Sequence, residues 1–181
     1  MSEVDLLELA GHQHGYFTTA QAGAAGISRR ALVGREHRGL IERAAHGLYR
    51  LRQYPMTSMD DFYALQASVP AATFSHDTAL EMYALSDLLP TTIHVTVPPE
   101  SGLKPRPGIT VHRSRIDPRD RTLRDDLWLT SLARTLLDCA RAGTDAEQLL
   151  AALAAGRERA LLPPEALARL NGVYPFSGRT W

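Results

Sequence analysis

The sequence of 181 residues contains a single cysteine, a single lysine and no long apolar run. With Cys139 alone no internal disulfide can form, and its place in the helical pattern "ARTLLDCARA" predicts a small buried thiol rather than a nucleophile. No segment approaches the roughly 20 apolar residues of a membrane span, and the acidic start lacks the features of a signal peptide. We therefore expect a soluble cytoplasmic protein without membrane contact.

The lack of lysine also bears on catalysis. A restriction-type nuclease centre needs acidic metal ligands beside a lysine, whereas Lys104 lies in the loop "GLKPRPG". We find no motif for nucleotidyl transfer and no glycine-rich phosphate loop. His94 and His112 on neighbouring predicted strands can meet, but two histidines without a nearby carboxylate make a weak metal site. We predict no catalytic residue, cofactor or metal, and a divergent nuclease is the least favoured alternative.

Charge is distributed unevenly along a chain whose formal net charge is zero. Residues 28–54 contain seven arginines and two glutamates, a net of five positive charges. Residues 102–124 contain one lysine and six arginines against two aspartates, which again leaves five positive charges. Two basic segments in an otherwise acidic chain indicate directed contacts with polyanions or with acidic partner surfaces.

The first 52 residues have the local signals of three helices and a hairpin. After a first helix, Thr18 with Gln21 caps a short second helix that ends at Gly26. Ser28 caps a third helix that runs to Gly39. Two helices joined by a turn of about three residues predict a helix-turn-helix.

A hairpin is predicted directly after the third helix. The segments "LIERA" and "LYRLR" flank a turn at Gly47, and a hairpin in this position is a wing. Pro55 and "MTSM" mark a boundary, so we predict a winged helix-turn-helix DNA-binding domain at residues 1–54. Residues 55–181 then form a second domain of α+β type.

The second domain is predicted to combine a small β-sheet with packed helices. Helical spacing occurs in "MDDFYALQASV" and in "SHDTALEMYAL", the latter capped by Ser75. Three short strands that should share one sheet are "TIHVTVP", "ITVHRS" and "LWLT". "LARTLLDCARA", "DAEQLLAALAAGRERA" and "PEALARL" complete a helical end, and the last eight residues are left unplaced. The fold class is α+β, a winged helix-turn-helix followed by this mixed domain.

The third helix carries the residue types that read DNA. Arg29 and Arg30, just after the cap, can each bind a guanine edge with two hydrogen bonds, and Val33 can touch a thymine methyl. Thr18 and Thr19 begin the second helix, where hydroxyls and free amides suit a phosphate. The full predicted DNA-binding set is Thr18, Thr19, Ser28, Arg29, Arg30, Val33, His37, Arg38, Arg43, His46 and Arg50.

These residues carry a family resemblance. "GYFTTAQAGAAGISRRALVGREHRGLIERAAHGLYRL" resembles the N-terminal winged helix of AbiEi-type antitoxins, the transcriptional regulators of type IV toxin-antitoxin systems. "FSHDTALEMYALSDLLPTTIHVTVP", "ITVHR" and "LTSLARTLLDCA" resemble segments of the second domain of that family, so the resemblance covers roughly residues 12 to 142. It implies binding to double-stranded operator DNA, repression of its own operon and counteraction of a nucleotidyltransferase-like toxin. Residues 55–181 would then be the α+β antitoxin and assembly domain. A homodimer on paired half-sites is expected, as for other helix-turn-helix proteins.

The second basic segment leaves three interpretations open. Arg106, Arg113, Arg115, Arg119 and Arg121 belong to a solvated loop, to a second DNA surface or to a dock for an acidic face of the toxin. The alternation in "VHRSR" predicts that two of these arginines lie on one side of a strand. The main alternative for the whole chain is a one-component regulator whose second domain binds a small ligand.

Overall fold

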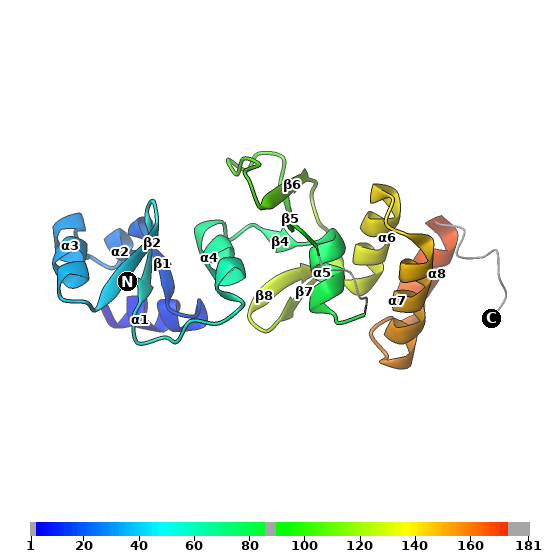
Figure 1. Ribbon diagram of the computed structural model, residues 1–181, viewed down its shortest axis with the longest axis horizontal. Helices are drawn as coiled ribbons and strands as arrows, with labels where there is room; N and C mark the ends of the chain where they lie inside the picture. Colours follow the sequence, from blue (N-terminus) through cyan, green and yellow to red (C-terminus); the bar gives the residue numbers. More distant parts are fainter. Residues whose placement is uncertain (1–2, 86–89, 174–181) are drawn as a thin grey trace. The chain divides into compact units, whose positions relative to one another are not determined.

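The computed structural model describes residues 3–85 and 90–173 and divides the chain into two compact units, residues 1–70 and 71–181 (Figure 1). The two units are α+β, as predicted, and each is described by itself. The unplaced segment at residues 174–181 lies outside the described residues. No helix among the described residues combines the length and the hydropathy that a membrane span requires.

The N-terminal unit places four helices around a three-stranded antiparallel sheet. The strand order is β1-β3-β2, so β3 is the central strand. The helices are α1 (Glu3–His12), α2 (Thr19–Ala24), α3 (Arg29–His37) and α4 (Asp60–Ser68), and the strands are β1 (Tyr16–Thr18), β2 (Ile41–Ala45) and β3 (Leu48–Leu51).

Local sequence signals fix the ends of α2 and α3 as predicted. The Thr18 side chain accepts from the Gln21 amide at 3.2 Å, and the Gln21 side chain accepts from the Thr18 amide at 2.8 Å. Ser28 accepts from the Ala31 amide, also at 3.2 Å. Gly26, between the two helices, has φ of 78°, a left-handed conformation that glycine adopts without strain. The capping of both helices therefore sets the angle at which α3 leaves the turn.

An apolar core joins the helix-turn-helix to the sheet. Phe17 and Leu32 are fully buried, and complete burial of one such side chain contributes about 1.5 to 3 kcal/mol. The other buried members are Leu6, Ala10, Ala22, Ala25, Ile27, Ile41 and Leu51. Every helix from α1 to α3 and each of the three strands contributes to this cluster, which makes the unit a rigid support for α3.

Helix α4 covers the remaining part of this unit. It packs against β1 and β3, and its first residue, Asp60, accepts a hydrogen bond of 2.8 Å from the Tyr16 hydroxyl. The compact unit therefore extends to residue 70, and the predicted limit at residue 54 falls within it, just before α4.

The second unit is built on a mixed five-stranded sheet with the order β6-β5-β4-β8-β7. Phe74, fully buried at its centre, pairs with Val95 on one side and Leu129 on the other. The strands are β4 (Thr73–Phe74), β5 (Ile93–Val97), β6 (Ile109–Arg113), β7 (Arg121–Arg124) and β8 (Leu127–Thr130). The three predicted strands do share one sheet.

Helices complete the second unit. They are α5 (His76–Met82), α6 (Leu132–Ala142), α7 (Ala146–Glu158) and α8 (Pro164–Val173), with a 3₁₀ turn at Pro118–Asp120. Helix α6 begins with a hydrogen bond from the Arg134 amide to the Ser131 side chain and packs against α5, α7 and α8. Cys139 on α6 is buried, as predicted, and burial raises the pKa of its thiol, which keeps it protonated.

Candidate nucleic-acid interface

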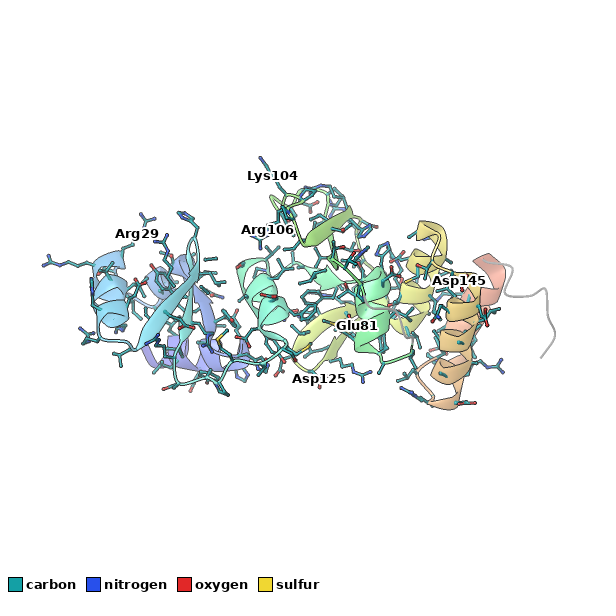
Figure 2. All side chains as sticks on the ribbon, viewed as in Figure 1. Arg29, Glu81, Lys104, Arg106, Asp125 and Asp145 are labelled. Carbon is teal, nitrogen blue, oxygen red and sulfur yellow. The ribbon has the colours of Figure 1, made fainter. Side chains whose placement is uncertain are left out.

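The exposed side of α3 carries the side chains that the sequence analysis assigned to DNA. Arg29, Arg30, His37 and Arg38 are all exposed, and Figure 2 labels Arg29 at the surface of this unit. Val33 keeps 46% of its surface exposed although it is apolar. The preceding residue, Leu32, is fully buried. Helix α3 therefore has one face in the core and another face available for contact.

A groove of about 790 Å³ lies between the helix-turn-helix and the hairpin. It is lined by Thr18, Thr19, Ala20, Gly23, Ile27, Ser28, Arg29, Val33, Arg43, His46, Gly47 and Tyr49, none of them acidic. Seven of the eleven predicted DNA-binding residues therefore meet at one concave surface. The pattern of capping and turn signals located them, whereas the lining residues Ala20, Gly23, Ile27 and Tyr49 carry no charge that would indicate DNA binding.

The hairpin is fastened to the start of α2. The Thr19 amide donates to the Gly47 carbonyl at 2.8 Å, and the Thr19 hydroxyl donates to the same oxygen at 3.3 Å. Gly47 has φ of 74°, which a glycine accepts at the turn between β2 and β3. These two bonds set the width of the groove, because they join its two walls.

Hydrogen bonds within the protein occupy the two amides of the predicted phosphate site. Free amides of Thr18 and Thr19 were expected, but the Thr18 amide donates to Gln21 and the Thr19 amide to Gly47. Both residues line the groove as supports of its shape. The next amide, that of the exposed residue Ala20, is the nearest donor at this helix start for which the structure shows no protein acceptor among the described residues.

Arg50 does not fit its predicted place in the interface. Its side chain is only 6% exposed, its guanidinium contacts the Glu42 carboxylate at 2.8 Å, and it donates to the Tyr54 carbonyl at 2.6 Å. The reason is that β3 is the central strand and α4 packs against it, so Arg50 faces the protein interior. We therefore exclude Arg50 from the DNA-binding set.

The exposed arginines differ from Arg50 in their partners. Among the described residues, no carboxylate is paired with Arg29, Arg30, Arg38 or Arg43. Arg43 instead approaches His46, with 3.4 Å between its Nη2 atom and the His46 Nδ1 atom, on the wall that the hairpin contributes. Their positive charge is thus available to an anionic ligand.

The second basic segment is largely engaged within its own unit. Arg113 donates to the carbonyls of Ser101 and Leu103 at 2.8 and 2.7 Å, which fastens the loop that precedes β6. Arg115 pairs with Glu100 at 3.3 Å, and Arg119 pairs with Asp117 at 3.4 Å.

The remaining positions of this segment also differ from a flat basic strand. Arg121 lies 4.2 Å above the Trp128 ring, a cation-π contact. Strand β6 ends at Arg113, so Arg115 lies beyond it and the predicted alternation along one strand is wrong. Lys104 and Arg106 are exposed and extend from the loop before β6 in Figure 2.

Comparison with known proteins relates the N-terminal unit to one family. Residues 4–52 match the family model described as "Transcriptional regulator, AbiEi antitoxin". The match confirms the resemblance noted in the sequence for this part of the chain, and it includes every residue that lines the groove. No curated protein sequence matches the chain. The N-terminal unit is thus similar to that of an antitoxin transcriptional regulator.

Proposed function

We propose that the N-terminal unit is a winged helix that binds operator DNA and that the chain represses transcription of its own operon. The observation that carries this proposal is the groove without acidic lining, which Arg29 of α3 lines together with Arg43 and His46 of the hairpin. A recognition helix in the major groove and a wing beyond it leave the sugar-phosphate backbone between them. The groove between α3 and the hairpin suits that strand in size and in charge.

The residues of α3 divide between reading bases and contacting phosphates. Arg29 and Arg30 occupy the first turn, from which a guanidinium can reach guanine O6 and N7, and each such pair discriminates by about 1 to 3 kcal/mol. Val33 presents an exposed apolar surface one turn later, suited to a thymine methyl. His37 and Arg38, at the end of α3, are placed for the backbone.

The test is a titration of the full chain with labelled DNA from upstream of its own gene and with scrambled DNA of equal length. Arg29→Ala and Arg30→Ala should each weaken operator binding about 10-fold or more while binding to scrambled DNA changes less. Arg157→Ala is the matched control, because it removes an exposed positive charge of α7, which lies in the other unit and outside both basic segments. Operator affinity unchanged in both α3 variants would refute the proposal.

The family description also supports an antitoxin role. In this proposal the second unit mediates assembly as a homodimer and opposes a nucleotidyltransferase-like toxin encoded beside the gene, in the cytoplasm. Co-expression with the neighbouring reading frame tests it. A double Arg29→Ala, Arg30→Ala variant that still rescues growth would show that neutralisation does not require DNA binding. Loss of rescue by the wild-type chain would refute the antitoxin role.

A regulator that senses a ligand through its second unit is the second candidate function. It is favoured by a cluster of three histidines in that unit. Such a cluster can bind a ligand, whereas a surface that only mediates assembly does not require one. The two functions are separable, because ligand sensing predicts operator affinity that depends on the ligand. Operator titrations with and without added Zn²⁺ distinguish them.

A further inference from the structure

Three histidines from separate segments of the second unit meet at one place. His76 begins α5, His94 lies in β5 and His112 lies in β6. The Nδ1 atom of His94 is 3.1 Å from the Nε2 atom of His112, and the rings of His76 and His112 stack with 3.6 Å between centroids. One ring nitrogen from each histidine lies within 4.8 Å of the other two.

The fold holds these rings through its backbone. Parallel pairing of β5 with β6 places His94 opposite Thr110 and His112 opposite Thr96, so the two histidines are diagonal neighbours. The His94 amide donates to the Thr78 hydroxyl at 2.8 Å, and the His94 carbonyl accepts from the Ser75 amide at 3.0 Å. Both bonds fasten the start of α5 to β5.

Ser75 has a different role from the helix cap that the sequence predicts. Its hydroxyl makes no capping bond to α5. Instead it accepts from the Thr96 hydroxyl at 2.8 Å and lies 2.9 Å from the Nδ1 atom of His76. A hydrogen bond to one ring nitrogen orients an imidazole and directs its other nitrogen, which is how metal-binding histidines are commonly fixed.

The backbone of His76 is also unusual. Its φ is 53°, a left-handed conformation that residues with a Cβ rarely adopt, and its side chain is buried. Strained backbone of this kind is concentrated at functional sites. A glycine at this position would relieve the strain but would remove the third ring.

We propose that His76, His94 and His112 bind a divalent transition-metal ion, Zn²⁺, with three imidazole ligands and a fourth position open to water or another donor. Zinc at about 2.0 to 2.1 Å from each nitrogen requires nitrogens about 3.4 Å apart. The His94 and His112 nitrogens are already near this separation. Rotation of the His76 ring would bring its nitrogen, which lies within 4.8 Å of both, to the same separation. This site goes beyond the proposed DNA-binding function and does not depend on it.

The chemistry of the donors selects the metal. Imidazole suits zinc and its neighbours among the transition metals, whereas magnesium and calcium prefer oxygen ligands. Burial lowers the pKa of all three histidines and so favours the neutral ring, which is the form that binds a metal. The Asp77 carboxylate lies close enough to interact electrostatically with each ring, and its negative charge favours a bound cation.

The test is a titration of the untagged, metal-stripped full chain with Co²⁺, a coloured substitute for zinc, followed by displacement with Zn²⁺. We expect one metal per chain, visible bands typical of four-coordinate cobalt, and a higher melting temperature with Zn²⁺. Absence of stoichiometric binding by the folded wild-type chain would overturn the proposal.

Two variants separate a metal site from a cluster that is only hydrogen-bonded. His112→Gln and His94→Asn each place an amide nitrogen near the lost ring nitrogen, so they keep a hydrogen bond but remove a ligand. Each should weaken Zn²⁺ binding at least about 100-fold, since even residues that only orient ligands change affinity 10- to 100-fold. The control His12→Gln changes an exposed histidine of the other unit and should bind as wild type. A variant that folds by circular dichroism yet keeps wild-type affinity would overturn the proposal.

Discussion

Arg50 lies directly opposite Glu42 in the β2–β3 pairing, and two nitrogens of its guanidinium are each 2.8 Å from the same Glu42 oxygen. The other Glu42 oxygen is 3.3 Å from Arg52. One carboxylate therefore binds two arginines that differ in environment, because the Arg50 side chain is 6% exposed and that of Arg52 is 59% exposed. The pair of arginines allows buried and exposed ion pairs to be compared on a single partner.

Arg50→Gln should lower the free energy of unfolding by about 2 to 3 kcal/mol, because it removes the charged hydrogen bonds of a buried guanidinium. Arg52→Gln should lower it by less than about 1 kcal/mol, because solvent screens that pair. Urea unfolding followed by circular dichroism measures both. Equal losses in the two variants would contradict the inward placement of Arg50.

Stability should also decrease in acid. Hydrogen bonding to Arg50 lowers the pKa of Glu42 below its usual 4.5. At Asp60, burial opposes ionisation, but hydrogen bonds from the Thr57 amide and from Tyr16 outweigh it and lower the pKa below 3.8. In both cases the unfolded state binds protons more readily, so the contribution is complete above these usual values and is lost as pH falls through the folded pKa.

The measurement compares wild type with Glu42→Gln between about pH 6 and about pH 3. The difference in unfolding free energy between the two proteins should be largest at the upper end and should shrink below about pH 4.5 as Glu42 becomes protonated. A difference that stays constant over this range would mean that the hydrogen bonds from Arg50 do not lower the pKa of Glu42.

Features set by neighbouring residues could be predicted from the sequence. The caps at Thr18 and Ser28 and the turn glycines Gly26 and Gly47 each depend on a few consecutive residues, and the structure confirms them. Strands β1 and β4 were not predicted, because three and two residues are too short to show an alternating pattern. Longer neighbours supply their hydrogen bonds, because β1 pairs with β3 along one edge and β4 lies between β5 and β8.

Features that depend on distant segments could not be predicted. Arg50 was assigned to DNA because charge and proximity to the wing favoured it, and only the packing of α4 shows that it faces inward. Ser75 was interpreted as a cap, although its partner is Thr96 on β5. His76 was not associated with His94, because their meeting depends on how α5 lies on the sheet. No local pattern encodes these contacts.

Helix α7 contains a glycine, Gly156, whose replacement by alanine should destabilise the protein. A Cβ atom on Gly156 would lie 2.5 Å from the Cδ2 atom of Leu132 and 3.3 Å from the Cδ1 atom of Leu162. Both leucines are buried, so overpacking of about 1 to 3 kcal/mol should exceed the gain in helix propensity of about 1 kcal/mol. Gly156→Ala should therefore lower the melting temperature.

Gly23 in α2 provides the matched comparison, because a Cβ atom there meets nothing within 4 Å. Gly23→Ala should stabilise the protein by up to about 1 kcal/mol. Opposite shifts in melting temperature by thermal unfolding are expected for the two variants. Stabilisation by Gly156→Ala would show that α6 and α7 pack less closely than the structure indicates.

The salt dependence of DNA binding tests which arginines contact phosphates. With Arg50 excluded and Arg29 and Arg30 assigned to bases, about four phosphate contacts from α3 and the hairpin predict a slope of log affinity against log salt near −3 to −4. Arg43→Ala should make the slope shallower by about 0.9 and weaken binding to operator and scrambled DNA alike, because a phosphate contact carries no sequence information. Arg50→Gln, measured where it remains folded, should leave the slope unchanged, since its guanidinium is bound by Glu42 inside the unit. If Arg50→Gln reduced the slope as much as Arg43→Ala, the inward orientation of Arg50 would not persist on DNA, and the interface would have to include the face of β3 that α4 covers.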